Sequence, residues 1–525
     1  MKNLFNTRWP LLLTLVVFII LKFNHLFANF FWDESWPYAS AVHQMYLHGP
    51  SLLPGSIPGE ESRGHPLFFH FLGAIWMKLF GTSKFAMHSY ALSISIAFLI
   101  AIYEASYRLF NRNVAVTALL LCAFQLIFFV QSAFVLPEIL VALLCFVSLY
   151  FYITRKYLIT ALTLTMLLYT KESGCVLALV LGIDAFIKLF NKKTPIKERL
   201  MAITSIIVPV LLIGCFFLLQ KKINGWYVLP LYTNGLEVTW DNFYYKIREG
   251  SKFLFRDSYR KYFFLLAIGL GLFAMIKDRK LIYGIFTLTG LGIFMLVSDD
   301  YYTTFPNYIM FSVFILAIFA AFYYCARITG FNSEYQKRFI LLSGLFTVLF
   351  LSFSAYNMFF LFRYMLIILM LILMITGVYF NYFISRISKY LFIPSLAIML
   401  CIEFYAYNHT PGIGDSNLNA FDGIYIHEKI AQYMVDHKLQ DKRISTGAYL
   451  HSVHLTDPYS GYLSPADTFG HVQWEIMPLT DYVIFDNIEN DSRYKFVKEN
   501  TLGYHLVYRV TKGEAWGEIY QQKHQ

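Results

Sequence analysis

The feature that most restricts the fold of this chain is a succession of long apolar runs separated by short charged connections. In the hydrocarbon core of a bilayer every backbone polar group must be satisfied within the protein, so spanning segments form helices or closed barrels. Only 14% of the 525 residues are charged, whereas soluble domains carry about 25%. The mean hydropathy of +0.51 agrees. The sequence therefore predicts a polytopic α-helical membrane protein.

The apolar runs define about 13 spans, some of them shorter than the usual length of about 20 residues. The first run follows Lys2 and Arg8 but lacks a convincing small-residue cleavage site, so we interpret it as an uncleaved span. We expect the spans near residues 10–31, 86–104, 114–131, 137–154, 157–170, 174–190, 200–219, 261–276, 281–298, 305–325, 339–355, 364–384 and 390–407.

The net charge of +10 is distributed along the chain in a way that indicates orientation rather than nucleic-acid binding. Alternate connections, such as "KLFNKKTPIKER" and "RITGFNSEYQKR", are basic. Cytoplasmic loops carry such an excess of Lys and Arg. We therefore expect a cytoplasmic N-terminus, a location in the cell inner (plasma) membrane, and a C-terminal region that is periplasmic or extracellular.

The C-terminal region is polar and differs from the rest of the chain. "IYIHEKIAQYMVDHK" has helical periodicity, and "RISTGAY", "DYVIFDN" and "YHLVYRV" are typical of strands. We predict a membrane domain at 1–407, including a first outer loop at 32–85, and a small α/β domain at 408–525 outside the membrane. We interpret "HSVHLTDPYSG" and "DNIENDSRY" as ordinary loops.

The first outer loop begins with "FFWDESWPYASAVHQMYLHG", in which Asp33 and Glu34 directly follow an apolar run. Pro37 fits the first turn of a helix, and Gly49 with Pro50 would end it. A helix N-terminus carries partial positive charge and favours ionised carboxylates. Helix capping and solvation would explain such acids in an arbitrary loop. At membrane depth, however, ionisable groups are costly and tend to be functional.

The "DE" pair, the surface helix and the later block "HPLFFHFLGAIWMKLFG" together resemble the GT-C glycosyltransferases. The protein O-mannosyltransferase-like and aminoarabinose lipid A transferase-like enzymes are the most similar branches. "LPEILVALLCFVSLYFY" and "YTKESG" resemble later segments of that family, so the resemblance covers about residues 1–190. It implies a GT-C fold and a transferase that uses a polyprenyl-phosphate-linked sugar at the outer membrane face, with inversion. It also implies that Asp33 is the essential acid and Glu34 the second acidic position.

Two positions depart from the pattern of these relatives. Trp36 stands where "DExR" would place a cation, and His65 replaces the lysine of "KPPL". Both changes remove a permanent charge that would hold phosphate. They put the lipid A branch, and the usual mode of phosphate binding, in doubt.

The chemistry of sugar transfer suggests roles for the ionisable residues. An acceptor hydroxyl must lose a proton, and a positioned carboxylate contributes about 10²–10⁴-fold as general base. We assign this role to Asp33, with Glu34, Glu60 or Glu61 as helper. The leaving phosphate needs cations where charge develops. Snorkelling to the interface is the alternative interpretation for Lys171 and Arg363. The predicted substrate-binding residues are Glu60, Glu61, Arg63, His65, Glu138, Lys171 and Arg363.

The first loop and its exit are also rich in histidine, at His43, His48, His65, His70 and His88. Spacing of the H-E-x-x-H type is absent. We therefore expect hydrated loop histidines, no metal site and no required cofactor. A divalent ion remains the alternative, because some GT-C oligosaccharyltransferases use one. The expected partners are a polyprenyl-phosphate-linked sugar, the bilayer, and a lipid, glycan or protein acceptor, but no nucleic acid.

Two other functions remain open at this stage. The chain could transport or flip a lipid-linked saccharide, although transporters usually show inverted repeats or paired broken spans. It could also be a membrane scaffold whose outer domain binds glycans or peptides. The long first outer loop favours catalysis over transport.

Overall fold

The computed structural model describes residues 2–234, 239–298, 307–328, 333–357, 360–476, 480–489, 492–500 and 503–523. The chain forms two compact units. The first, which we call the helical unit, comprises Met1–Ile20, Ser93–Phe129 and Pro137–His409. The second, which we call the α/β unit, comprises Leu21–Leu92, Val130–Leu136 and Thr410–Gln525.

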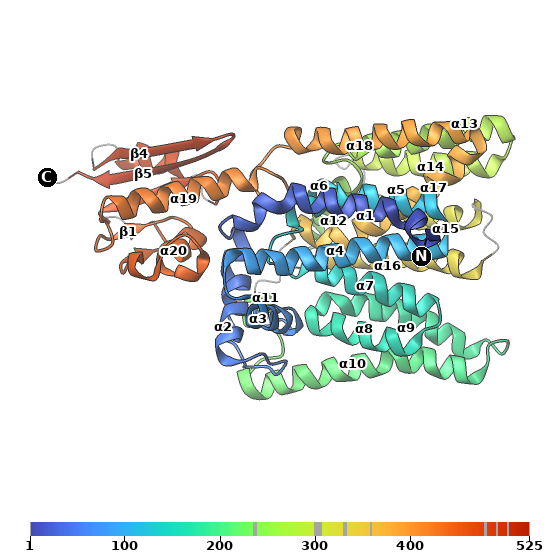
Figure 1. The fold of residues 1–525 in the computed structure, drawn as a ribbon, viewed down its shortest axis with the longest axis horizontal. Helices are drawn as coiled ribbons and strands as arrows, with labels where there is room; N and C mark the ends of the chain where they lie inside the picture. The colour runs from blue at the N-terminus through green and yellow to red at the C-terminus, as the bar shows by residue number, and fades with distance from the viewer. Residues whose placement is uncertain are drawn as a thin grey trace. The chain divides into compact units, whose positions relative to one another are not determined.

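The helical unit is a bundle of long helices that run side by side (Figure 1). Each predicted span overlaps a helix, although residues 305–306 of one prediction lie outside the described residues. The helices that belong wholly or mainly to this unit are α1 Lys2–Lys22, α4 Lys84–Leu109, α5 Arg112–Ala123, α6 Leu126–Gln131, α7 Glu138–Ile153, α8 Tyr157–Thr170, α9 Cys175–Phe190, α10 Ile196–Asn224, α11 Pro230–Asn234, α12 Trp240–Phe255, α13 Lys261–Asp278, α14 Leu281–Ser298, α15 Asn307–Ile328, α16 Glu334–Tyr356, α17 Leu366–Ile387 and α18 Phe392–His409.

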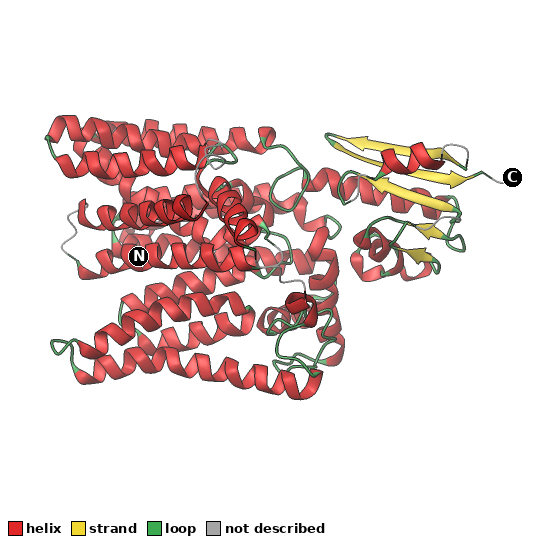
Figure 2. Ribbon diagram, turned by 180° about the vertical axis from the view of Figure 1, so that it is seen from behind, coloured by secondary structure: helices red, strands yellow, loops and turns green. Residues whose placement is uncertain are grey.

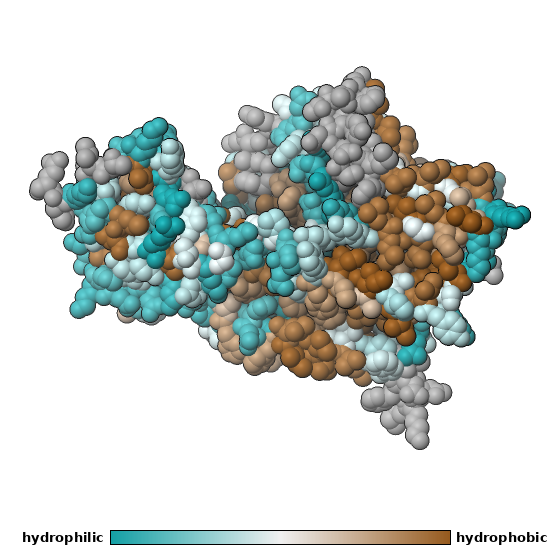
Figure 3. All heavy atoms as spheres, turned by 90° about the horizontal axis from the view of Figure 1, so that it is seen from above, coloured by the Kyte–Doolittle hydropathy of each residue, from teal (hydrophilic) through white to brown (hydrophobic). Residues whose placement is uncertain are grey.

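The pattern of burial divides these helices into inner and outer ones. Helix α17 is apolar on every side and buried over residues 366–380, as expected of a helix in the centre of a bundle. Helix α10 instead exposes large apolar side chains, among them Leu211 and Leu218. Apolar residues cover much of the bundle surface in a space-filling view (Figure 3). Such a surface is stable when lipid surrounds it.

Within the described residues, seven helices are long and apolar enough to cross a membrane, and six shorter apolar helices accompany them. The predicted class, a polytopic helical membrane protein, is confirmed.

Small residues allow some helices to pack closely. A Cβ atom on Gly344 of α16 would lie 2.7 Å from the Phe322 side chain of α15, so this contact requires a residue without one.

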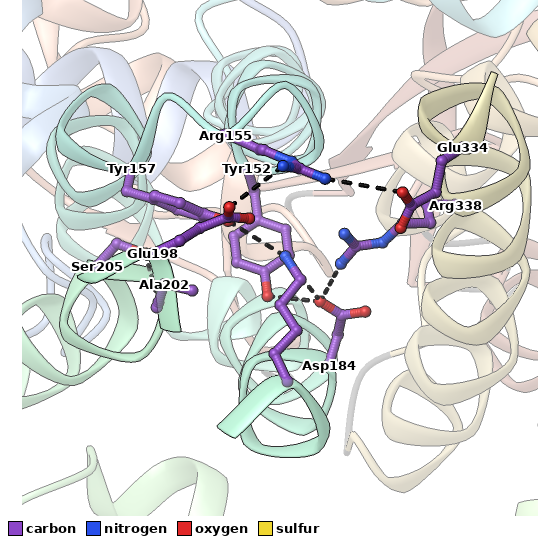
Figure 4. A network of polar contacts seen from close by, with 10 residues as sticks. Tyr152, Arg155, Tyr157, Asp184, Glu198, Ala202, Ser205, Glu334 and Arg338 are labelled. Atoms are coloured by element: carbon purple, nitrogen blue, oxygen red, sulfur yellow. Dashed lines mark hydrogen bonds and ion pairs between the residues drawn. The ribbon is translucent and has the colours of Figure 1, made fainter. Parts of the chain in front are cut away.

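A polar network joins four helices of the bundle at the end of α7 opposite Glu138 (Figure 4). Asp184 of α9 accepts a hydrogen bond from Tyr152 Oη at 2.6 Å and pairs with Arg338 of α16. Arg155 pairs with Glu198 of α10 at 3.2 Å and with Glu334 at 3.7 Å. The network therefore fastens α7, α9, α10 and α16 to one another.

The α/β unit contains the first outer loop and the C-terminal domain, by which we mean residues 410–525. In the loop, α2 Ser40–His48 ends at Gly49 with φ 99°, and α3 Phe68–Phe80 ends at Gly81 with φ 88°. The helix predicted after Pro37 and its stop at Gly49 are confirmed, and the later block "HPLFFHFLGAIWMKLFG" forms α3. The division at 407/408 remains a prediction, and the structure adds that the loop packs with residues 410–525.

The C-terminal domain is a mixed sheet covered by a helix (Figure 2). The strand order is β2-β1-β3-β5-β4, with β1 parallel to β2 and β3, and with β5 antiparallel to β3 and β4. Gly517 of β5 lets the helix approach, because a Cβ there would lie 2.5 Å from Ile430. The elements are α19 Ala420–Asp436, β1 Ile444–Ser445, α20 Tyr449–Thr456, β2 Val472–Gln473, β3 Tyr482–Asp486, α21 Arg493–Asn500, β4 Tyr504–Lys512 and β5 Ala515–Gln522.

The sequence prediction succeeded for most of this domain and failed at one segment. The helix and the three strands are confirmed. The loop predicted at "HSVHLTDPYSG" is wrong over its first half, because residues 449–456 form helix α20. A helix of only eight residues is hard to predict from the sequence alone, because so short a helix depends on tertiary contacts for its stability.

We predict that Asp184→Ala lowers the free energy of unfolding by about 1–3 kcal/mol, because Tyr152 and Arg338 lose a partly buried acceptor. Thermal and denaturant unfolding of the detergent-solubilised protein measures the change. Glu334→Ala is the matched control, since its side chain is 68% exposed and exposed pairs contribute at most about 1 kcal/mol. Equal effects of the two substitutions would contradict the role given to Asp184.

Candidate functional site

Asp33 lies in a tight 3-10 turn, Trp32–Glu34, and its side chain is half-buried. Trp32 has φ 55°, a left-handed conformation that costs a non-glycine residue about 1–3 kcal/mol. Such a conformation persists only where the surroundings hold it. The contacts of the neighbouring residues therefore decide how well Asp33 is positioned.

Glu34 is the main anchor of this turn. Its carboxylate is fully buried and accepts hydrogen bonds from the Phe31 amide at 3.1 Å and the Val135 amide at 2.7 Å. His88 Nε2 lies 2.9 Å from the same carboxylate, and His88 Nδ1 lies 3.1 Å from the Leu26 carbonyl oxygen. Both ring nitrogens of His88 therefore face oxygen atoms, one of them on Glu34. The burial of Glu34 supports a positioning role for it.

Residues of the C-terminal domain hold the Asp33 segment from a second direction. Tyr462 Oη donates to the Phe30 carbonyl at 2.7 Å. Ser35 Oγ donates to the Trp32 carbonyl at 2.8 Å and lies 3.0 Å from His454 Nε2. The ring of Tyr449 packs edge-on against Trp36, with centroids 4.7 Å apart. Phe30 to Trp36 is thus fixed on both sides of Asp33.

Trp36 holds a cation, although the "DExR" pattern would place a cation at position 36 itself. The Arg63 guanidinium lies 4.4 Å from the centre of the Trp36 ring, which is a cation–π contact. Trp36 stands where a cation was expected, and it holds Arg63 from a later turn of the first outer loop. This contact assembles a positive charge beside the Asp33 segment.

The remaining predicted residues of the loop lie in the turn that carries Arg63. Glu60 is exposed, and Glu61 is half-buried. Burial, followed by the charge of Asp457, raises the pKa of Glu61. His65 is buried, and its amide donates to the Ser62 carbonyl at 2.9 Å. The structure therefore places all four predicted loop residues in one turn near Trp36 and Tyr449.

A cavity of about 470 Å³ opens in the α/β unit next to Phe30. Ligand pockets typically have volumes of about 300–1,000 Å³. His43 stacks on Tyr459 at its wall, with ring centroids 3.8 Å apart. Lys84 contributes the positive charge and donates to Asn29 Oδ1 and to the Gly461 carbonyl. The cavity is large enough for a small ligand.

The predicted cations of the spans form a second group, in the helical unit. Lys171 Nζ lies 3.0 Å from Glu138 Oε1, and Arg363 Nε lies 3.5 Å from the same oxygen. All three side chains are buried. Glu138 begins α7, Lys171 follows α8, and Arg363 precedes α17. Lys171 and Arg363 thus both pair with Glu138, which brings two buried cations together.

The sequence reasoning missed a cluster of ionisable residues in the C-terminal domain. His427, His451 and His454 are buried together, with one ring nitrogen of each within 4.8 Å of the others. Asp486 Oδ2 lies 3.0 Å from His451 Nδ1 and 3.5 Å from His427 Nε2. The available signal was the spacing of His451 and His454, which places both on one face of a helix.

Burial governs the protonation of this cluster. It lowers the pKa of His427 to about 4, an effect that the neighbouring His451 reinforces, and it lowers the pKa of His454 well below the usual value. For Asp486, burial acts to raise the pKa, but contacts with His427 and His451 hold it well below the usual value. Imidazole and carboxylate side chains of this kind are common metal ligands.

Part of this chain is similar to a family of glycosyltransferases. Residues 64–218 match the family described as dolichyl-phosphate-mannose-protein mannosyltransferase. This match confirms the resemblance seen in the sequence. It includes His65, Glu138 and Lys171, whereas Asp33, Glu34 and Arg363 lie outside it.

Solved structures of GT-C proteins are similar to this chain at low identity. ArnT from Cupriavidus metallidurans is 13% identical, with 96% of this chain and 97% of that chain covered and a TM-score of 0.43. The Archaeoglobus fulgidus oligosaccharyltransferase is 12% identical, with 96% and 73% covered and a TM-score of 0.45. The S. cerevisiae Pmt1-Pmt2 complex is 14% identical, with 41% and 33% covered and a TM-score of 0.33. A comparison with curated protein sequences gives no significant match.

We predict that Glu34→Ala lowers the free energy of unfolding by about 3–5 kcal/mol, because it leaves a buried imidazole without its partner carboxylate. Two buried amides also lose their acceptor. The thermal midpoint of the purified protein measures the effect. Glu60→Ala, at an exposed position of the same loop, should change stability by no more than about 0.5 kcal/mol. An unchanged midpoint for Glu34→Ala would rule out the anchoring role.

Proposed function

We propose that the protein transfers a sugar from a polyprenyl-phosphate donor to an acceptor hydroxyl at the outer membrane face, with inversion at the anomeric carbon. The observation that carries the proposal is the held position of Asp33, a half-buried carboxylate on a segment anchored by Glu34 and the C-terminal domain. A general base must be positioned in this way. The description of the matched family names dolichyl-phosphate-mannose. This supports a polyprenyl-phosphate donor here.

In the proposed reaction, the acceptor oxygen attacks the anomeric carbon while the bond from that carbon to the phosphate oxygen breaks. Asp33 takes the hydroxyl proton as the new bond forms. Attack from the face opposite the leaving group inverts the configuration. The lipid phosphate leaves with the electron pair of the broken bond. Its charge is stabilised by cations aimed at the leaving group. The candidates are Arg63 in the α/β unit and, separately, Lys171 and Arg363 in the helical unit.

The charge distribution supports the proposed orientation. Arg155, Lys188 and Arg338 meet at the end of α7 opposite Glu138, and their connections are those that the positive-inside rule assigns to the cytoplasm. The Glu138 end of the bundle is then the outer end. A cytoplasmic N-terminus in the inner (plasma) membrane follows from the same bias. The reacting groups would then all lie outside the cytoplasm.

We predict that Asp33→Asn reduces sugar transfer by about 10²–10⁴-fold, because it removes the base without changing the shape of the side chain. A deletion strain should accumulate a polyprenyl-phosphate sugar and lose one surface glycan modification. Mass spectrometry of lipids and surface glycans, after complementation with each variant, measures both. Asp436→Asn, an exposed control in the same unit, should restore transfer fully.

Two outcomes would overturn the assignment. Full restoration by Asp33→Asn at equal protein levels would remove the proposed base. Reconstituted vesicles that show movement of the lipid-linked sugar without any transfer would instead favour a flippase.

We further predict that Lys171→Met lowers kcat by about 10²-fold or more, because the leaving phosphate loses a cation where its charge develops. Lys171→Arg should recover part of the activity. Lys222→Met, at an exposed position, removes the same charge from the chain and should leave kcat unchanged. Steady-state kinetics with the donor identified from the deletion strain measures these effects. Equal activities of Lys171→Met and Lys222→Met would exclude a role for Lys171 in transfer.

A further inference from the structure

We propose that His427, His451, His454 and Asp486 form a closed binding site for a divalent transition-metal ion, with Zn²⁺ the best match. The metal would hold the C-terminal domain together and fix the segment that carries Asp33. This site departs from the expectation of no metal that the sequence alone supported. It does not depend on the identity of the sugar donor or acceptor.

Four side chains from three elements converge on the site. His427 comes from the middle of α19, and His451 and His454 lie one turn apart on α20. Asp486 ends β3. Each of the four is at most 1% exposed. Buried polar side chains are normally hydrogen-bonded, so a group of this kind requires a partner.

The contacts of His454 determine which of its ring nitrogens has a free lone pair. The Ser35 hydroxyl already donates its hydrogen to the Trp32 carbonyl. Ser35 Oγ therefore accepts from His454 Nε2, 3.0 Å away, and Nε2 carries the hydrogen. His454 Nδ1 is then unprotonated, and it is buried with no hydrogen-bond partner among the described residues. Metal-binding histidines have this arrangement, in which one nitrogen binds the metal and the other donates to a fixed acceptor.

Asp486 is held in the same way. Its Oδ1 accepts from the amides of Ile488 and Glu489, both at 2.7 Å. Its Oδ2 lies 3.0 Å from His451 Nδ1 and 3.5 Å from His427 Nε2. A metal ion between them would also compensate the buried negative charge, which is costly when unpaired.

The ligand set fits zinc better than other common ions. Imidazole nitrogens with one carboxylate oxygen suit Zn²⁺, whereas Mg²⁺ and Ca²⁺ prefer oxygen ligands alone. Metal–nitrogen bonds of about 2.0–2.1 Å place tetrahedral ligand atoms about 3.3–3.5 Å apart. The distances from Asp486 Oδ2 to His451 Nδ1 and His427 Nε2, 3.0 and 3.5 Å, are close to this spacing. Four protein ligands leave no open position, so the role is structural rather than catalytic.

The site connects to the Asp33 segment through one hydrogen bond. His454 contacts Ser35, which is two residues after Asp33. A metal ion bound to His454 would therefore hold the turn in one position from the side of the C-terminal domain. Loss of the metal should loosen that turn.

We predict that the full-length protein, purified in detergent without chelators, contains one zinc ion per chain by inductively coupled plasma mass spectrometry. X-ray absorption at the zinc edge should show nitrogen and oxygen ligands at about 2.0–2.1 Å and no sulfur. His427→Ala, His451→Ala and His454→Ala should lose the zinc. His437→Ala, an exposed control at the end of α19, should retain it. A chelator should lower the thermal midpoint of the wild type and of His437→Ala only.

Ser35→Ala is a second variant that leaves all four proposed ligand side chains in place. It removes the acceptor that orients His454 and should weaken zinc binding by about 10–100-fold, measured by competition with a chromophoric chelator. Metal-free wild type that fails to bind added ZnCl₂ would overturn the proposal. Full zinc content in all three histidine variants would also overturn it, since the metal would then lie elsewhere. Unchanged zinc affinity in Ser35→Ala would overturn the assigned role of Nδ1.

Discussion

The contact on which the candidate site depends is the buried carboxylate of Glu34. Taking a carboxylate out of water costs several kcal/mol unless it is fully hydrogen-bonded, and here two backbone amides and His88 compensate it. These partners come from the first outer loop, the start of α4 and the connection before α7. One side chain therefore joins three separate parts of the chain. Asp33 is positioned because its neighbour is not free to move.

The predicted cations have held positions within their own units. In the α/β unit, Arg63 lies against the ring of Trp36. In the helical unit, Lys171 and Arg363 both pair with Glu138. The family pattern would supply such charges at positions 36 and 65. In this chain positive charge comes from other positions, and Trp36 contributes by holding Arg63.

The sequence predicted the helices well and the contacts between them poorly. Each span overlapped a helix, because hydrophobicity over about 20 residues is a local property. Asp33, Glu138 and Lys171 could be selected because acids and cations beside apolar runs are rare and costly. The histidine cluster could not be selected in the same way. The spacing of His451 and His454 acquires meaning only when α19 and β3 bring His427 and Asp486 to the same point.

By itself, the sequence determined that the chain is a membrane protein, where its helices lie, which ends of them are basic, and which enzyme class its first outer loop resembles. These properties depend on residues close together in the chain. Only the tertiary structure decided that Glu34 is an anchor, that Trp36 holds Arg63, and that His454 holds Ser35. The last two residues are 419 positions apart. Such pairs depend on how helices and strands pack in three dimensions, because a hydrogen bond is directional and acts over about 3 Å.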